Sequence, residues 1–99
     1  MIPPYFRFFQ PRFRPGRVFV TVAALVVLRT ANISPVELLL RHVSGDWGDL
    51  SESDRQQNEL SVEAGLRLLS SYVMPGGQTV WVITEWDRST STILLPEDY

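Results

Sequence analysis

Residues 66–95, LRLLSSYVMPGGQTVWVITEWDRSTSTILL, decide the fold class. Three runs within them, 66–73, 79–86 and 90–95, are rich in β-branched, aromatic and leucine residues, which is typical of strands. The connections between the runs are short enough to form hairpins, so we predict a three-stranded antiparallel β-meander. Both faces of the middle run are apolar at their centre, and we therefore expect this strand to be central and covered on both sides.

The N-terminal half favours helices after one short strand. Residues 17–20 are β-branched and aromatic and predict that strand, followed by a helix over about 22–30. Ser-Pro-Val-Glu at 34–37 combines an N-cap, a proline at the first helical position and a capping-box glutamate, and predicts a helix over 35–43. A third, surface helix follows over about 52–63. The predicted fold class is α+β, with an N-terminal short strand and two to three short helices packed on a three-stranded antiparallel β-meander.

The chain divides at Gly16 into an arm and a body. Residues 1–16 hold four prolines, five aromatics and three arginines without an acid, and this density of proline predicts an extended arm. Residues 17–99 are predicted to form a single α+β domain, since 99 residues is the size of one domain. We expect the aromatic side chains of the arm to pack on the domain or on a partner subunit. A mobile leader, or an arm that stacks on single-stranded nucleic acid, is an alternative.

Composition and charge exclude several classes of function. The chain has no cysteine, so disulfides, thiolate zinc sites and a cysteine nucleophile are excluded and a cytoplasmic location is favoured. The apolar run 18–28 is shorter than the about 20 residues that cross a bilayer, so we expect no membrane partner. No phosphate-binding loop, dinucleotide fingerprint or nucleophile elbow is present, and no cofactor is expected. The body holds six arginines and eleven acidic residues, which suits a basic protein partner better than nucleic acid.

Two acidic, tryptophan-containing segments supply the candidate partner-binding residues. A tryptophan in a loop or at a strand end is often either a core residue or an interface anchor. We favour the interface for Trp47, leave both open for Trp86, and interpret Trp81, in the middle of a strand, as a core residue. The candidates are Asp46, Trp47 and Asp49 in the loop 45–50, and Glu85, Trp86, Asp87 and Arg88 at the end of the middle strand.

A metal-dependent phosphodiester hydrolase is an alternative interpretation. An imidazole with several carboxylates can hold a divalent metal or perform acid–base chemistry, and the candidates are His42, Asp46, Asp49 and Glu59. Their spacing matches no known metal motif. A structural interpretation is favoured, in which His42 interacts with the C-terminal dipole of its helix and the aspartates stabilise glycine turns.

Several blocks occur in order along the body: RHVSGDWGDL (41–50), Asp54, Asn58-Glu59, GLRLLSSY (65–72), VWVITEWDRS (80–89) and TILLPEDY (92–99). Together they resemble a family of small bacterial proteins carried on plasmids and integrative elements, labelled "plasmid-related" and sometimes restriction-associated. The arm does not resemble this family, and Trp86 stands where a smaller residue is expected. The family has no assigned activity, so the resemblance implies mobile-element biology and nothing about catalysis.

Together these observations predict a small non-catalytic interaction protein from a mobile genetic element. We expect it to bind a host or defence-system protein through an acidic and aromatic surface, as an anti-CRISPR or anti-restriction inhibitor does. The hydrolase and a nucleic-acid-binding module that uses the arm are the alternatives. An exposed strand edge or the arm could also support a homodimer.

Overall fold

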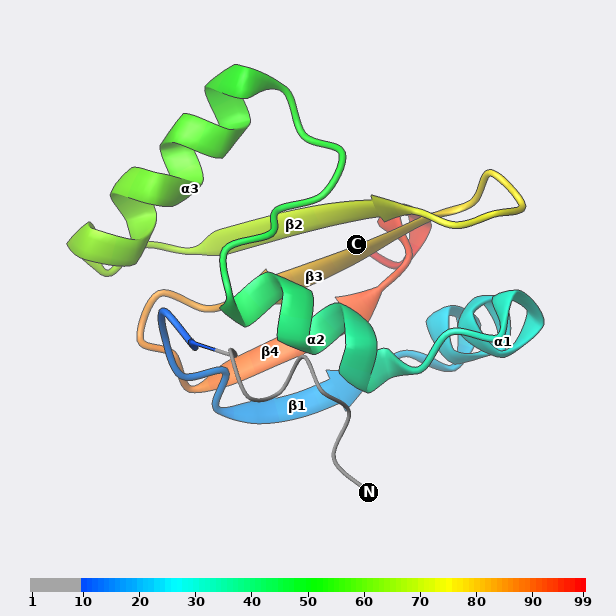
Figure 1. The fold of residues 1–99 in the computed structure, drawn as a ribbon. Coiled ribbons are helices and arrows are strands. Elements are labelled where there is room, and N and C mark those ends of the chain that lie inside the picture. Colours follow the sequence, from blue (N-terminus) through cyan, green and yellow to red (C-terminus); the bar gives the residue numbers. More distant parts are fainter. Residues whose placement is uncertain (1–9) are drawn as a thin grey trace.

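The computed structural model describes residues 10–99, and their fold is α+β with three helices and a four-stranded mixed sheet. Figure 1 shows the arrangement of the elements. In chain order they are β1 (Arg17–Val20), α1 (Val22–Ala31), α2 (Pro35–Val43), α3 (Glu52–Ala64), β2 (Leu68–Val73), β3 (Thr79–Thr84), β4 (Thr90–Leu94) and a short 3-10 helix, η2 (Pro96–Asp98).

The sheet has the strand order β1-β4-β3-β2. Strands β2, β3 and β4 form the predicted antiparallel meander. The expectation that the N-terminal strand packs on a three-stranded meander is wrong, because β1 joins the sheet as a fourth strand, parallel to β4. The amide of Arg17 donates to the carbonyl of Ser89 over 3.0 Å, and the amide of Thr21 donates to that of Ile93 over 2.9 Å. This pairing satisfies the side of β4 that the meander alone leaves open.

Side-chain caps begin each of the three helices, as the sequence predicts. The hydroxyl groups of Thr21, Ser34 and Ser51 accept hydrogen bonds of 3.1–3.2 Å from the backbone amides of the first turn. Asn32 ends α1 in the left-handed conformation, with a φ of 57°. The predicted helix bounds are therefore confirmed to within one or two residues.

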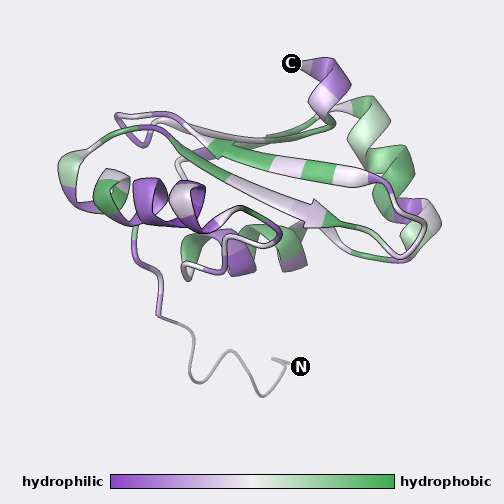
Figure 2. Cartoon of the chain, turned by 90° about the horizontal axis from the view of Figure 1, so that it is seen from above, coloured by the Kyte–Doolittle hydropathy of each residue, from purple (hydrophilic) through white to green (hydrophobic). Residues whose placement is uncertain are grey.

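One face of the sheet carries the apolar core, covered by α1 and α2 (Figure 1). The helix α1, at the right of Figures 1 and 2, is largely hydrophobic, and α3, at the left, is largely hydrophilic (Figure 2). The core residues come from both helices, the last three strands and the segments that follow them: Ala24, Val27, Leu28, Leu38, Tyr72, Met74, Val80, Val82, Ile93 and Leu95.

Within residues 10–99 no single helix is long and apolar enough to cross a bilayer. Only α1 and α2 taken together meet the length and composition, and they are bent by 100° at the break between them.

Candidate functional site

The loop 45–50, predicted to be a docking surface, lies along the outer edge of β2. The amide of Ser71 donates to the carbonyl of Trp47 over 3.1 Å, and the amide of Asp49 donates to the carbonyl of Ser71 over 2.6 Å. The carboxylate of Asp49 accepts a further hydrogen bond of 2.9 Å from the amide of Val73. The loop therefore satisfies backbone groups that an edge strand would otherwise expose.

Asn58 continues this cover along the same edge. Its side-chain amide donates to the carbonyl of Leu69 over 2.6 Å and accepts from the amide of Leu69 over 3.2 Å. The side chain thus makes both bonds that a neighbouring strand would make at this position, and it fixes α3 to β2. Asn58 is buried, and the sequence alone does not single it out as a site residue.

Trp47 is buried, with 3 % of its surface exposed, and is not available as an interface anchor. Its ring stacks on Phe13 at a centroid distance of 6.2 Å and meets the ring of His42 edge-on at 5.8 Å. The cause is the backbone pairing of the loop with β2, which holds the tryptophan side chain beneath the edge of the sheet. Asp46 is exposed, but Arg41 donates to it over 2.7 Å. Partial burial raises the pKa of Asp46, but the hydrogen bond and charge of Arg41, the amide of Gly48 and the charge of Arg55 together outweigh it, so the pKa lies below its ordinary value.

Arg88, in the second predicted segment, has a structural role. It adopts a positive φ of 61° in the turn between β3 and β4. Its guanidinium donates to the carbonyl of Leu66 over 2.6 Å and to that of Ser61 over 2.8 Å, at the end of α3. It also lies 5.6 Å from the ring centroid of Phe13. Phe13 therefore links the two predicted segments through Arg88 and Trp47.

The other residues of the second segment lie at the surface. Glu85 forms a long ion pair of 3.7 Å with Arg67, and the carboxylate of Asp87 accepts from the amide of Ser89 over 3.0 Å. Trp86 is 65 % exposed. Among the candidate partner-binding residues, Trp86 is thus the apolar side chain that the structure leaves open to a partner.

Residues 10–16 of the predicted arm pack on the body. The amide of Arg12 donates to the carbonyl of Val43 over 2.7 Å, and Phe13 meets the ring of His42 edge-on at 5.2 Å. The prediction that an arm aromatic packs on the domain is confirmed for Phe13. The other four arm aromatics lie in residues 1–9, outside the described part of the chain, so a nucleic-acid function of the arm stays a prediction.

His42 is the centre of a buried hydrogen-bonded chain. Its Nδ1 lies 2.6 Å from the hydroxyl of Ser70, and its Nε2 lies 2.8 Å from the hydroxyl of Thr84. The chain continues from Thr84 to Ser91 over 2.6 Å and from Ser91 to the carbonyl of Pro15 over 2.7 Å. It joins α2 to all three strands of the meander and to the segment that precedes β1.

The carbonyl of Pro15 sets the direction of every proton in this chain. A carbonyl only accepts, so Ser91 donates to Pro15 and must accept from Thr84. Thr84 in turn accepts from Nε2 of His42, which leaves Nδ1 as the acceptor for Ser70. The chain therefore requires a proton on Nε2, and with the imidazole neutral, as its lowered pKa makes it at neutral pH, Nδ1 accepts. Burial, and then the positive charge of Arg88, lower its pKa to about 3.

The structure does not bring together the residues of the predicted metal site. Both ring nitrogens of His42 are bonded inside the core, and Glu59 pairs with Arg12 over 2.6 Å. Asp46 and Asp49 are bonded to Arg41 and to the β2 backbone. Within residues 10–99, no group of three or more histidine and acidic side chains is placed to hold a metal ion.

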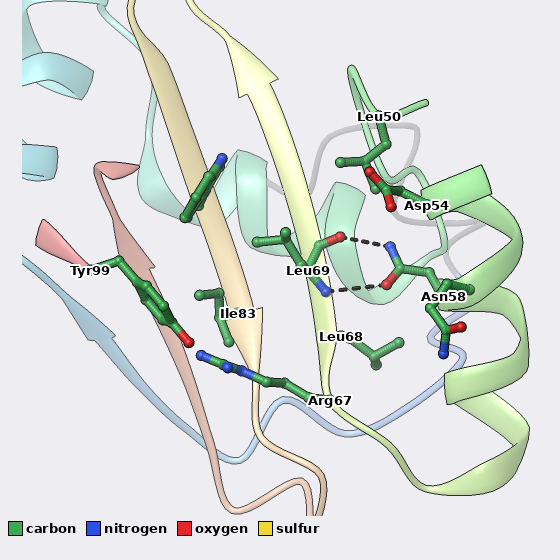
Figure 3. Close-up of a pocket in the computed structure, with 10 residues that line it drawn as sticks. Leu50, Asp54, Asn58, Arg67, Leu68, Leu69, Ile83 and Tyr99 are labelled. Carbon is green, nitrogen blue, oxygen red and sulfur yellow. Dashed lines mark hydrogen bonds between the residues drawn. The ribbon is translucent and has the colours of Figure 1, made fainter. Parts of the chain in front are cut away.

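A groove of about 370 Å³ lies on the sheet face opposite α1 and α2. Figure 3 shows Asp54 and Asn58 of α3 on one side of β2 and Tyr99 on the other, with Leu69 and Ile83 between them. The full lining is Leu50, Asp54, Gln57, Asn58, Arg67, Leu68, Leu69, Trp81, Ile83 and Tyr99.

Aromatic and basic side chains form the side of this groove next to Tyr99. Trp81 is half-buried and meets the ring of Tyr99 at a centroid distance of 6.1 Å, and the guanidinium of Arg67 lies 5.0 Å from that ring. The interpretation of Trp81 as a core residue is therefore correct for only part of its surface. Within residues 10–99, α3 and Tyr99 leave a groove on this sheet face over Leu69 and Trp81, which are half-buried, and Ile83, which is buried. The alternating pattern of β3 indicates an apolar second face, but it cannot show that nothing covers it.

Comparison of the chain with protein-family models, curated proteins and solved structures gives no match. The resemblance to plasmid-borne proteins therefore stays a prediction.

The contact of the acidic loop with β2 predicts a specific requirement for glycine at position 48. Gly48 has a φ of 76°, and a Cβ there would overlap the carbonyl oxygen of Ser71. Gly77 has a φ of 88° with open space around it, so it is the matched control. We expect Gly77→Ala to cost about 1 kcal/mol in the free energy of unfolding and Gly48→Ala at least about 2 kcal/mol more. Urea denaturation measures both, and equal costs would contradict the close contact.

The buried chain predicts that Thr84 is sensitive to loss of its hydroxyl. Thr84→Val leaves the Nε2–H of His42 without an acceptor, and we expect a loss of about 1–3 kcal/mol in the free energy of unfolding. Thr92→Val is the control, because Thr92 is half-buried on the open face and makes no side-chain hydrogen bond to the described residues; we expect a change within about 0.5 kcal/mol. Thermal and urea unfolding would show whether the two variants differ.

The burial of His42 predicts that it does not titrate near neutral pH in the folded protein. It is the single histidine of the chain, so its imidazole resonances are unambiguous in NMR spectra. Since the folded pKa of about 3 is below the unfolded value of 6.5, the stabilisation is complete above pH 6.5 and is lost as the pH falls toward 3. Between pH 7 and 5 we expect His42 shifts to stay constant while the protein loses on the order of 2 kcal/mol. A titration midpoint near 6.5 would exclude the buried arrangement.

Proposed function

We propose that the protein is a small non-catalytic interaction protein that binds a protein partner in the groove between α3 and Tyr99. The observation that carries this proposal is an apolar groove of about 370 Å³ on a sheet face, with Leu69, Trp81 and Ile83 as its floor. The alternative site in the loop 45–50 has less support, because Trp47 is buried and the loop backbone is paired with β2.

The chemistry of the groove favours an apolar or aromatic side chain of the partner. A volume of about 370 Å³ suits one or two such side chains. Tyr99 is 70 % exposed and can close over an inserted group together with Trp81. Tryptophan, tyrosine and arginine are the residues most enriched among interface hot spots, and this groove holds all three types.

The charge of α3 favours basic residues around that anchor. The helix carries four acidic side chains and one arginine, and Asp54 lies on the rim of the groove. Such a rim repels the phosphate backbone of nucleic acid and attracts a basic protein surface, mainly by raising the rate of association. The preferred partner is therefore a protein that presents an apolar side chain flanked by lysine or arginine.

A cytoplasmic host or defence complex is the partner class we propose. Nucleic-acid-processing complexes expose basic surfaces, and a small acidic protein can occupy such a surface without chemistry of its own. The support is the acidic body of the chain and the resemblance of its sequence blocks to plasmid-borne proteins. In this proposal the protein acts as an anti-CRISPR or anti-restriction inhibitor.

A pair of exposed aromatic residues tests the proposed site. Tagged wild-type protein, Tyr99→Ala and Trp86→Ala are used to capture partners from a bacterial lysate, and retained proteins are quantified by mass spectrometry. Loss of a hot-spot side chain costs at least about 1.4 kcal/mol, so we expect Tyr99→Ala to reduce retention of the specific partner at least tenfold. Trp86→Ala, outside the groove, should leave retention unchanged.

Two outcomes would contradict the groove as the site. Equal retention by all three proteins would show that Tyr99 takes no part in binding. Loss with Trp86→Ala alone would place the partner at the turn between β3 and β4. A photoreactive phenylalanine derivative at position 99, compared with the same group at position 86, separates these cases, because it crosslinks a partner seated in the groove.

A further inference from the structure

The two edges of the sheet differ in how their backbone groups are satisfied. On the outer edge of β2, Leu69, Ser71 and Val73 are bonded by Asn58 and the loop 45–50. The other edge is β1, and among residues 10–99 only β4 pairs with it. An unpaired edge strand is a ready site for pairing with another chain.

The hydrogen bonds to β4 define which groups of β1 face outward. The amides of Arg17 and Thr21 donate to the carbonyls of Ser89 and Ile93 in or beside β4. Because successive residues of a strand direct their backbone groups to opposite sides, the N–H and C=O groups of Val18 and Val20 point away from the sheet.

Apolar side chains accompany this free edge. Val18 is 41 % exposed and Phe19 is 46 % exposed. Directly after the strand, Val22 and Val26 of α1 are 80 % and 58 % exposed. The segment from residue 17 to residue 36 contains no acidic residue, and its exposed valines gain free energy when they are covered.

We propose that β1 pairs with β1 of a second copy of this chain, antiparallel and related by a two-fold axis at Phe19. In this register Val18 of one copy faces Val20 of the other, and each donates its amide to the carbonyl of its neighbour. The two-fold axis repeats this exchange, so every outward-facing group of both residues is bonded. The two Phe19 side chains then meet in a non-hydrogen-bonded pair, where side chains of opposite strands approach most closely.

Charge complementarity supports the same register. Arg17 of one copy lies opposite Thr21 of the other, and Thr21 donates to the carboxylate of Asp98 over 2.7 Å. Residues 17, 19 and 21 point to one face of the sheet, so the guanidinium of each copy lies beside the Asp98 carboxylate of the other. In the single chain Arg17 has no acidic partner among the described residues, and its guanidinium lies 5.4 Å from the ring centroid of Phe19.

The pairing joins the two sheets into one and presents both grooves on the same face. A four-residue strand is short, and stable interfaces bury about 1,200–2,000 Å², so the dimer is a weak one with a Kd on the order of 10 µM. The dimer does not depend on the proposed function of the groove, because the β1 edge and the groove share no residue.

Sedimentation velocity of the full chain at increasing concentration tests the dimer. We expect the wild type to pass from monomer to dimer between about 1 and 300 µM, which spans the expected Kd. Val18→Pro removes only an outward-facing N–H, and proline is compatible with an edge strand, so this variant should fold and stay monomeric. Circular dichroism and thermal unfolding check its fold.

A charge change tests the register and remains informative if Val18→Pro does not fold. Arg17→Glu places two carboxylates side by side across the interface, and we expect it to weaken the dimer at least tenfold. Gln56→Glu adds a negative charge at an exposed position of α3, which lies against β2 at the opposite edge of the sheet, and should leave the dimer unchanged. The proposal is overturned if the wild-type protein stays monomeric up to 300 µM, even if its β1 edge pairs with a different protein. It is also overturned if a folded Val18→Pro variant dimerises like the wild type.

Discussion

The backbone groups at the outer strands of the sheet impose the constraint on which this structure depends. A small sheet has a large proportion of edge, and each unbonded N–H or C=O there either contacts water or invites another chain. Here one edge is covered from within the chain by a loop and by the amide of Asn58, which explains why α3, a mostly hydrophilic helix, is held against β2. The acidic loop therefore supports the sheet, and the recognition surface that we propose is the sheet face that carries the groove.

A polar chain inside the core complements this edge cover. His42, Thr84 and Ser91 bond side chains across α2, β3 and β4, and the last bond fixes the backbone at Pro15. Buried polar groups add little net stability when they are satisfied, but they destabilise any arrangement in which one partner is missing. The chain thus selects one position for the segment before β1, and with it the placement of Phe13 over Trp47.

The sequence predicts the features that depend on neighbouring residues and misses those that depend on distant ones. Capping serines and threonine define the helix starts, and short turns define the meander. The pairing of β1 with β4 joins residues more than seventy positions apart, and no local pattern reports it. Trp47 lies in an acidic loop and reads as an exposed residue, yet backbone pairing of the loop turns it inward. The glycine at position 48 is a weak signal of this pairing, because its positive φ and its close approach to Ser71 both require glycine. For the groove, the apolar second face of β3 was predictable, but which distant segments pack beside it was not; among residues 10–99 these are α3 and Tyr99.

The double hydrogen bond between Asn58 and Leu69 makes the fold depend on an intact amide at position 58. Deamidation of an asparagine to an aspartate keeps the size of the side chain but replaces the donor with a second acceptor, and the isoaspartate product also lengthens the backbone. The new carboxylate would then face the carbonyl of Leu69, to which the side-chain amide of Asn58 now donates a hydrogen bond. Ageing of this one buried amide would repel α3 from the sheet, remove one wall of the groove and expose the edge that it protects.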